Sequence, residues 1–143
     1  GDEKEQLALL MEIVRLEPIA AKLMRRVDDE VEGPDGKPLP PGELYDIDIR
    51  NLNVHEELVG ECPFAVDAQR AQRQQDSGRF FSFGDGPHSC PGSQVALHET
   101  RIFLQALFQV PGLKLDREPD ITWNEMVHGY ELRNADISCD KAG

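Results

Sequence analysis

The stretch FGDGPHSCPG, from Phe83 to Gly92, is the feature that most restricts how this chain can fold. It places three glycines, two prolines, a histidine and a cysteine within ten residues, and a helical pattern begins directly after it. Glycine permits backbone conformations with positive φ, whereas proline fixes φ and removes an N–H donor. The sequence therefore predicts a tight turn that presents one thiol, that of Cys90, at the N-terminus of a helix.

The position of Cys90 suits a metal ligand. A thiolate is the form of cysteine that binds metals, and a helix N-terminus stabilises it through unpaired N–H groups and the positive end of the helix dipole. Pro91 fits the first helical position, where a missing N–H costs nothing. Phe83 could cover the sulfur, and His88 could reach an anionic group.

Two other interpretations apply to such a loop. A cysteine in a glycine-rich turn can simply be buried or redox-active, and the loop by itself leaves that open. A phosphate-binding loop fits less well, because GDGPHSC lacks the Lys-Ser/Thr pair that handles phosphate and Mg²⁺. The other cysteines, Cys62 and Cys139, lie far away, and the three form neither a disulfide framework nor a Cys-x-x-Cys zinc pattern.

The composition excludes several classes of partner. The chain has 143 residues and a formal net charge of −12, from 27 acidic and 15 basic residues. This balance argues against nucleic acid and against an anionic membrane surface. No apolar run approaches the roughly 20 residues of a membrane span, and the acidic start does not resemble a signal peptide. We expect a cytoplasmic protein in a reducing compartment.

Hydrophobic periodicity and turn residues predict a chain of short elements, both helical and extended. The apolar stripe of the long helix after the loop is expected to face a core; it comprises Val95, Ala96, Ile102, Phe103, Ala106, Leu107 and Val110. The expected elements are a helix at 4–17 ended by Pro18, a strand at 23–32, a turn at 33–36, an alternating strand at 44–50, an irregular coil at 51–82, the helix at 92–110 and short strands near 113–115 and 127–138.

The residues from Phe83 to Gly92 resemble the haem-binding signature of cytochrome P-450, Phe-x-x-Gly-x-His/Arg-x-Cys-x-Gly, at every constrained position. The resemblance implies a haem b (heme b, iron protoporphyrin) cofactor, with Cys90 as the metal ligand and catalytic thiolate. His88 matches the position that holds a haem propionate, and Phe83, Gly84 and Gly92 complete the cofactor-binding loop. Cysteine ligation of haem iron favours cleavage of the O–O bond.

Further motifs of the same family appear in order. Glu12 and Arg15 resemble its Glu-x-x-Arg pair, and Arg70 in PFAVDAQR resembles the arginine that joins this pair as a structural triad. Arg25 resembles the strand arginine that meets the other propionate, with Arg26 as a neighbour that could do the same. Asn53 resembles the first residue of an Asn-Arg-Asp turn from which the next two residues depart.

One substitution and one pocket follow from the same resemblance. Leu97 stands where the family usually has an arginine, which we expect to cost only a surface charge. Two mostly apolar stretches should face a substrate, and each of their residues could equally be an ordinary core residue. The candidate pocket residues are Ala20, Ala21, Met126 and Val127.

The resemblance covers almost all 143 residues but only the carboxyl-terminal third of a full family member. It implies an α+β, mainly helical arrangement and a single partial domain at 1–143. It also implies a haem-thiolate monooxygenase that takes a small, mainly apolar organic substrate, a ferredoxin- or reductase-type electron donor, and the remainder of the cytochrome P-450 chain as partner. The alternatives are a peroxide-using or isomerising relative and a truncated, non-catalytic haem-binding or interaction protein. We expect the segment alone to be inactive.

Overall fold

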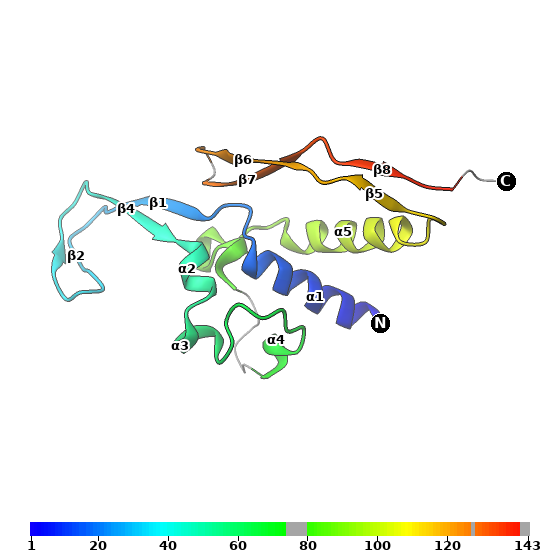
Figure 1. Cartoon of the computed structure of the whole chain (residues 1–143). Coiled ribbons are helices and arrows are strands. Elements are labelled where there is room, and N and C mark those ends of the chain that lie inside the picture. The colour runs from blue at the N-terminus through cyan, green and yellow to red at the C-terminus, as the bar shows by residue number, and fades with distance from the viewer. Residues whose placement is uncertain (74–79, 127, 141–143) are drawn as a thin grey trace.

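The computed structural model describes residues 1–73, 80–126 and 128–140, in which helices combine with small antiparallel sheets (Figure 1). The predicted α+β class is thereby confirmed. None of the described helices is both long enough and apolar enough to cross a membrane. The helices are α1 (Glu3–Leu16), α2 (Ile49–Asn53), α3 (Glu56–Val59), α4 (Arg70–Arg73), the 3₁₀ turns η1 (Phe81–Phe83) and η2 (Gly86–His88), and α5 (Ser93–Leu107).

Helix α1 begins at a capping box. The Asp2 carboxylate accepts the Glu5 N–H at 2.9 Å, and the Glu5 carboxylate accepts the Asp2 N–H at 3.1 Å. This exchange satisfies donors that a helix N-terminus otherwise leaves free. The helix ends two residues before Pro18, close to the predicted bounds, and buries Leu10, Glu12 and Arg15.

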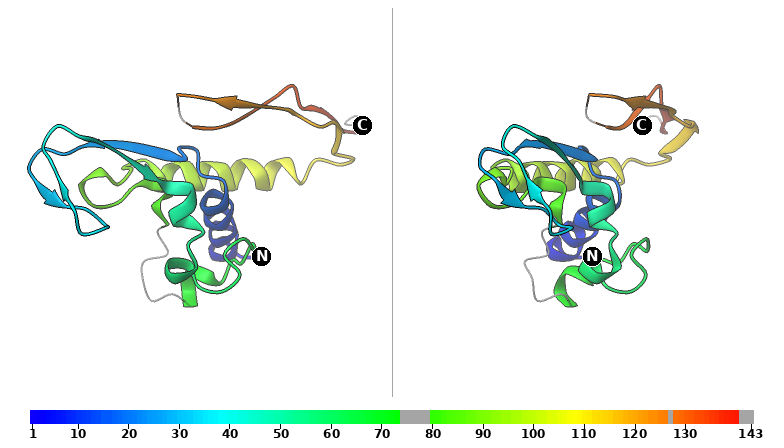
Figure 2. Two further views of the ribbon diagram at one scale, coloured as in Figure 1. Left: turned by 60° about the vertical axis from the view of Figure 1, so that its left-hand side comes forward. Right: turned by 90° about the vertical axis from the view of Figure 1, so that its left-hand side faces the viewer.

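The predicted strand at 23–32 is divided into two. Strand β1 (Lys22–Arg26) pairs with β4 (Leu44–Asp48), whereas β2 (Val31–Glu32) pairs with β3 (Pro38–Leu39) in the hairpin that extends from the body (Figures 1 and 2). The acidic residues between β1 and β2 are exposed and lie outside both ladders. The prediction of one continuous strand was therefore wrong.

The alternating pattern at 44–50 also ends earlier than predicted. The Asp48 carboxylate accepts the N–H of Asn51 at 3.0 Å and so starts α2. The predicted irregular coil at 51–82 contains the end of α2, all of α3 and α4 and the start of η1, joined by segments without regular structure; residues 74–79 of it lie outside the described residues.

Helix α5 packs beside α1, and only one of its residues, Leu97, is buried. Most of the predicted apolar stripe is exposed on the described chain, including Val95, Ile102 and Phe103. The periodicity identified the helix but not the face that packs on α1. The expectation that Leu97 lies at the surface was likewise wrong, since only 6% of this residue is exposed.

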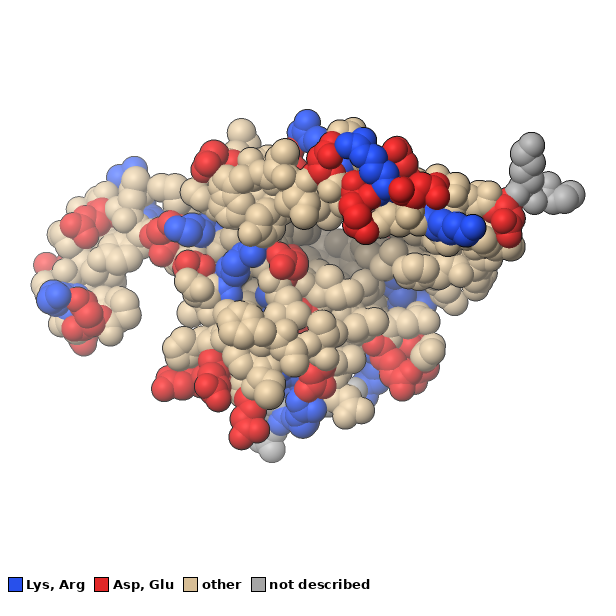
Figure 3. Space-filling view, viewed as in Figure 1, with Lys and Arg blue, Asp and Glu red and all other residues tan. Residues whose placement is uncertain are grey.

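Two carboxyl-terminal ladders run above α5 (Figures 1 and 2). The space-filling surface is hollowed between this layer and the helical body (Figure 3). Trp123 and Tyr130 pack edge to face across the second ladder, with ring centroids 5.3 Å apart. The ladders pair β5 (Lys114–Arg117) with β8 (Asp136–Ser138), and β6 (Asp120–Asn124) with β7 (Gly129–Arg133).

Candidate functional site

The loop before α5 is closed by one main-chain hydrogen bond. The N–H of Cys90 donates to the carbonyl of Phe83 at 2.7 Å, which brings the two ends of FGDGPHSC together. Gly84 has φ +72°, and a Cβ at this position would lie 2.7 Å from the carbonyl oxygen of His88. Only glycine fits there without a shift of the backbone.

The Cys90 thiol is free and exposed, at the wall of a cavity of about 170 Å³. The cavity lies where the loop at residues 81–92, here named the ligand loop, meets the two long helices α1 and α5. Its walls therefore come from distant parts of the chain. Buried Leu97 of α5 contributes to the apolar part of the wall. The other lining residues are Met11, Phe83, Gly84, Ser89, Ser93 and Gln94.

These residues fit a haem. The donor set is a single free thiol, which suits an iron whose remaining ligands come from a macrocycle. The Cys90 side chain opens to the surface, and Gly92 lies so close that a Cβ there would be 4.0 Å from the Cys90 Sγ. His88, two residues before the cysteine, is exposed and can turn towards an anionic group.

Arg15 is completely buried and uses all its N–H groups. Its Nε and Nη2 donate to the two carboxylate oxygens of Glu12 at 2.8 and 3.0 Å. The other bonds go to the main-chain carbonyls of Asn53, Pro63 and Ala65, at 2.7, 2.7 and 3.2 Å. Arg15 therefore fixes α1 to the last residue of α2 and to two points of the chain that follows it.

Arg70 is saturated in the same way and is 2% exposed. Its Nε donates to Glu12 Oε2 at 3.3 Å. The remaining N–H groups donate to four carbonyls within the same coil, those of Val59, Glu61, Cys62 and Ala65. The two arginines share the Ala65 carbonyl, so the coil is folded around them.

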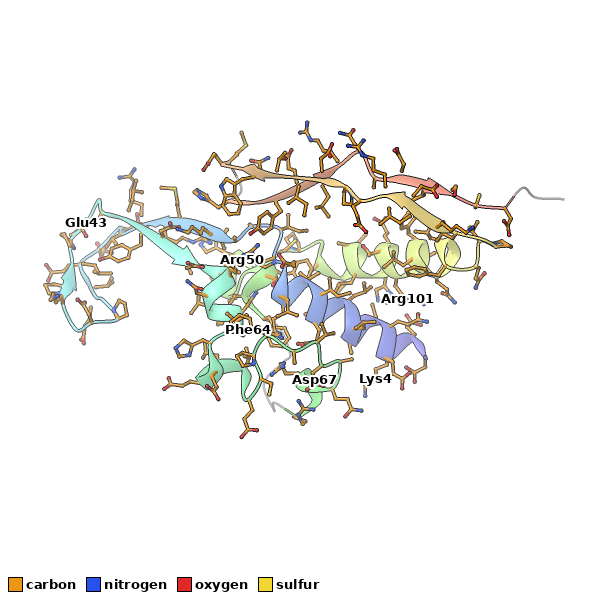
Figure 4. All side chains as sticks on the ribbon, in the orientation of Figure 1. Lys4, Glu43, Arg50, Phe64, Asp67 and Arg101 are labelled. Atoms are coloured by element: carbon orange, nitrogen blue, oxygen red, sulfur yellow. The ribbon has the colours of Figure 1, made fainter. Side chains whose placement is uncertain are left out.

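Glu12 stays ionised between these cations. Burial alone would raise the pKa of its carboxyl, but hydrogen bonds from Arg15, the Asp67 N–H and Arg70, together with the charge of Arg15, lower that pKa below its ordinary value of 4.5. The Asp67 N–H donates to Glu12 Oε2 at 3.0 Å, and Asp67 lies beside α1 at the turn that leads into α4 (Figure 4). The structure thus brings Glu12, Arg15 and Arg70 into one buried cluster.

The two candidate propionate arginines occupy different environments. Arg25 is half-buried, and its Nη1 donates to the Met24 carbonyl at 2.9 Å. Arg26 is exposed, and its Nη1 donates to the Gly42 carbonyl at 2.9 Å, at the far end of the β1–β4 ladder. Since successive residues of a strand point to opposite faces, the two side chains cannot both face a ligand on one side of the ladder.

The candidate substrate residues differ widely in solvent exposure. Ala21 is 4% exposed, and its carbonyl accepts the Arg50 N–H at 3.2 Å, as in a core residue. Ala20 is half-buried and Met126 is 90% exposed. Val127 lies outside the described residues.

Arg50 links the end of α1 to the β6–β7 hairpin. Its guanidinium ion-pairs with Glu17 at 3.1 Å and lies over the Tyr130 ring, 5.0 Å from the centroid, below the β6–β7 hairpin (Figure 4). Sequence reasoning missed this contact, and it also missed Met11 in the cavity beside Cys90. The sequence signal that could have pointed to Met11 is its position next to Glu12 of the Glu-x-x-Arg pair.

Comparison with known proteins identifies the fold first. The crystal structure of CYP109E1 from Bacillus megaterium in complex with testosterone superposes with a TM-score of 0.77 over 97% of this chain and 37% of that chain, at 23% identity. The fold is therefore the one seen in solved cytochromes P450.

The sequence comparisons define the family. A family model for cytochrome P450 matches residues 7–126. The chain is 30% identical over 127 residues to cytochrome P450 4F5 of Rattus norvegicus, covering 82% of this chain and 24% of the relative. It is 32% identical over 109 residues to cytochrome P450 monooxygenase ausR of Penicillium brasilianum, covering 68% and 22%. The chain belongs to the cytochrome P450 family, and it spans about a quarter of the length of these curated relatives.

Proposed function

We propose that residues 1–143 are the haem-ligating carboxyl-terminal portion of a cytochrome P450 monooxygenase, in which Cys90 is the axial thiolate of a haem b. The observation that carries the proposal is the loop closed by the Cys90–Phe83 hydrogen bond. It presents a free, exposed thiol shortly before α5, which begins at Ser93 with Gly92 as its N-cap rather than at the predicted Pro91. Bound haem supplies the iron at which dioxygen is activated for transfer of one oxygen atom to an organic substrate.

The residues around Cys90 hold and shield the cofactor. Gly84 and Gly92 let the backbone approach a flat ring, and half-buried Phe83 limits the access of water to the sulfur. His88 and Arg25 bind the two propionates. The half-buried position of Arg25, against the exposed one of Arg26, supports this choice.

The buried cluster of Glu12, Arg15 and Arg70 supports the same site through α1. It fixes the coil from Asn53 to Ala65 against α1, whose Met11 forms part of the cavity wall beside the sulfur. We assign it a structural role, because its side chains are hydrogen-bonded within the protein and show almost no exposed surface.

The substrate is a small, mainly apolar organic molecule, which Ala20 and Met126, of the four candidate residues, help to accommodate. Two electrons per turnover come from a ferredoxin- or reductase-type donor. Together with two protons they reduce the second oxygen atom to water. The remainder of the polypeptide supplies the groups that deliver these protons, so we expect residues 1–143 alone to be inactive.

The decisive experiment uses the full-length, haem-loaded protein. Cys90→Ser should abolish the thiolate-type absorption of the reduced carbon monoxide complex, while Cys62→Ser, which alters another exposed cysteine, should leave it unchanged. A spectrum that survives in Cys90→Ser would show that another residue ligates the iron.

A further inference from the structure

Asn53 has no exposed surface, and both polar atoms of its side chain are hydrogen-bonded. Its Oδ1 accepts the N–H of Phe81 at 2.9 Å. Its Nδ2 donates to the carbonyl of Arg15 at 3.1 Å and to the hydroxyl of Ser82 at 2.8 Å. One side-chain amide therefore connects α2 with α1 and with η1.

These bonds complete the carboxyl end of α1. The last four carbonyls of a helix have no partner within it, and here they belong to residues 13–16. The Ile13 carbonyl accepts the Glu17 N–H at 2.8 Å, while the Val14 carbonyl accepts the Ser82 hydroxyl at 2.8 Å. Asn53 and Ser82 thus cap α1 from distant parts of the chain.

The network requires an amide at position 53. The Ser82 hydroxyl donates its proton to Val14 and must accept from Asn53, and the Arg15 carbonyl can only accept. The Phe81 N–H can only donate. A side chain with donors on one side and an acceptor on the other satisfies all three of these partners. A carboxylate or an alkyl group does not.

The same amide holds the start of the ligand loop. Phe81, whose N–H bonds to Asn53, begins η1, and its carbonyl accepts the Gly84 N–H at 2.9 Å. Phe83, at the other end of this single turn, accepts the N–H of Cys90 at 2.7 Å. Displacing the first residue of so short a turn displaces the carbonyl to which the cysteine is bonded.

We propose that Asn53, together with Ser82, is a positioning residue that fixes the ligand loop against α1 and sets where the Cys90 sulfur stands. Its effect on the haem rests on the proposed function, whereas its effect on the loop does not. Asn53 is not among the residues that line the cavity beside Cys90, so it acts through Phe81, Phe83 and Cys90.

The test compares Asn53→Ala and Ser82→Ala with Asn51→Ala in the full-length protein. Asn51 is an exposed asparagine of the same helix, bonded to Asp48, and serves as the matched control. Ser82→Ala removes only the hydroxyl and keeps the test informative if Asn53→Ala does not fold. The readouts are amide hydrogen exchange at Cys90 and within α1, and the absorption of the reduced carbon monoxide complex.

We expect exchange of the Cys90 N–H to rise about tenfold in Ser82→Ala, the effect of one lost hydrogen bond, with little change at amides in the first turns of α1. The thiolate-type band should weaken in parallel, and Asn51→Ala should alter neither readout. Exchange that rises equally throughout the protein, or that does not rise at Cys90, would overturn the proposal. If the unaltered protein lacks the thiolate-type band, the proposed function fails, but exchange at Cys90 still decides the role of Asn53.

Discussion

The Nε of Arg70 lies 3.3 Å from Oε2 of Glu12, although 58 residues separate them in sequence. Both side chains are 2% exposed. A buried ion pair repays the cost of desolvation only when its remaining polar groups are also hydrogen-bonded. Here the coil supplies these partners as main-chain carbonyls. An irregular backbone uses few of its carbonyls in ladders or helices, so most remain available as acceptors.

Arg70→Lys should destabilise the protein strongly. A lysine offers three donors from one point, whereas the arginine bonds to Glu12 and to four carbonyls spread over residues 59–65. We expect a loss of about 3–5 kcal/mol in the free energy of unfolding, measured by denaturant titration.

Arg73→Lys is the matched control for this change. The side chain of Arg73 is 58% exposed and pairs with Asp67, so the same substitution should leave the free energy of unfolding almost unchanged. Equal losses in the two variants would contradict the structural role of the cluster.

Glu12 predicts a pH dependence with a definite sign. Since its pKa is lower in the folded than in the unfolded chain, its contribution is complete above the ordinary value of 4.5 and is lost as the pH falls through the lower, folded value. The difference in unfolding free energy between the unaltered protein and Glu12→Gln should be constant near neutral pH and shrink below about pH 4.5. A difference that stays independent of pH down to about 3 would refute the assignment.

The sequence predicts the parts of this site that carry local signals. The carboxyl end of α1 follows from Pro18, whereas α5 ends at Leu107, before the predicted end at residue 110; the glycines and prolines around Cys90 define the ligand loop. The residues that resemble the family's triad meet in the structure. Their carbonyl partners could not be predicted, because a main-chain carbonyl has no sequence signature and the contacts span up to 58 residues.

Periodicity failed where it could not identify the packing partner. The stripe through Val95, Ile102 and Phe103 is apolar, yet α5 buries Leu97 beside α1 and leaves the stripe exposed on the described chain. A helix that is apolar on more than one face gives no indication of which face meets which neighbour. The role of Asn53 was equally hidden, since its four hydrogen bonds join it to residues of two other elements, α1 and η1, that are distant in sequence.

Leu97→Ala should open a void beside the thiol cavity. The leucine is buried between α1 and the ligand loop, so its truncation should cost about 2–4 kcal/mol in unfolding free energy. Leu97→Met keeps the volume and should cost less than about 1.5 kcal/mol. Denaturant unfolding of both variants checks this prediction, and a negligible loss in Leu97→Ala would show that the position is not packed.

Gly84→Ala and Gly86→Ala separate backbone strain from collision in the ligand loop. Both glycines have positive φ, +72° and +55°, so an alanine at either position costs about 1–2 kcal/mol of left-handed strain. Only at Gly84 does the new Cβ meet another atom, the His88 carbonyl oxygen at 2.7 Å; at Gly86 nothing lies within 4 Å. That oxygen belongs to the backbone and cannot turn aside as a flexible side chain would, so Gly84→Ala must move the loop that presents Cys90.

We expect Gly84→Ala to lose the thiolate-type band of the reduced carbon monoxide complex and Gly86→Ala to retain it with a modestly lower melting temperature. If both variants keep the band, the loop can absorb the collision, and the close approach at Gly84 does not control the placement of the sulfur.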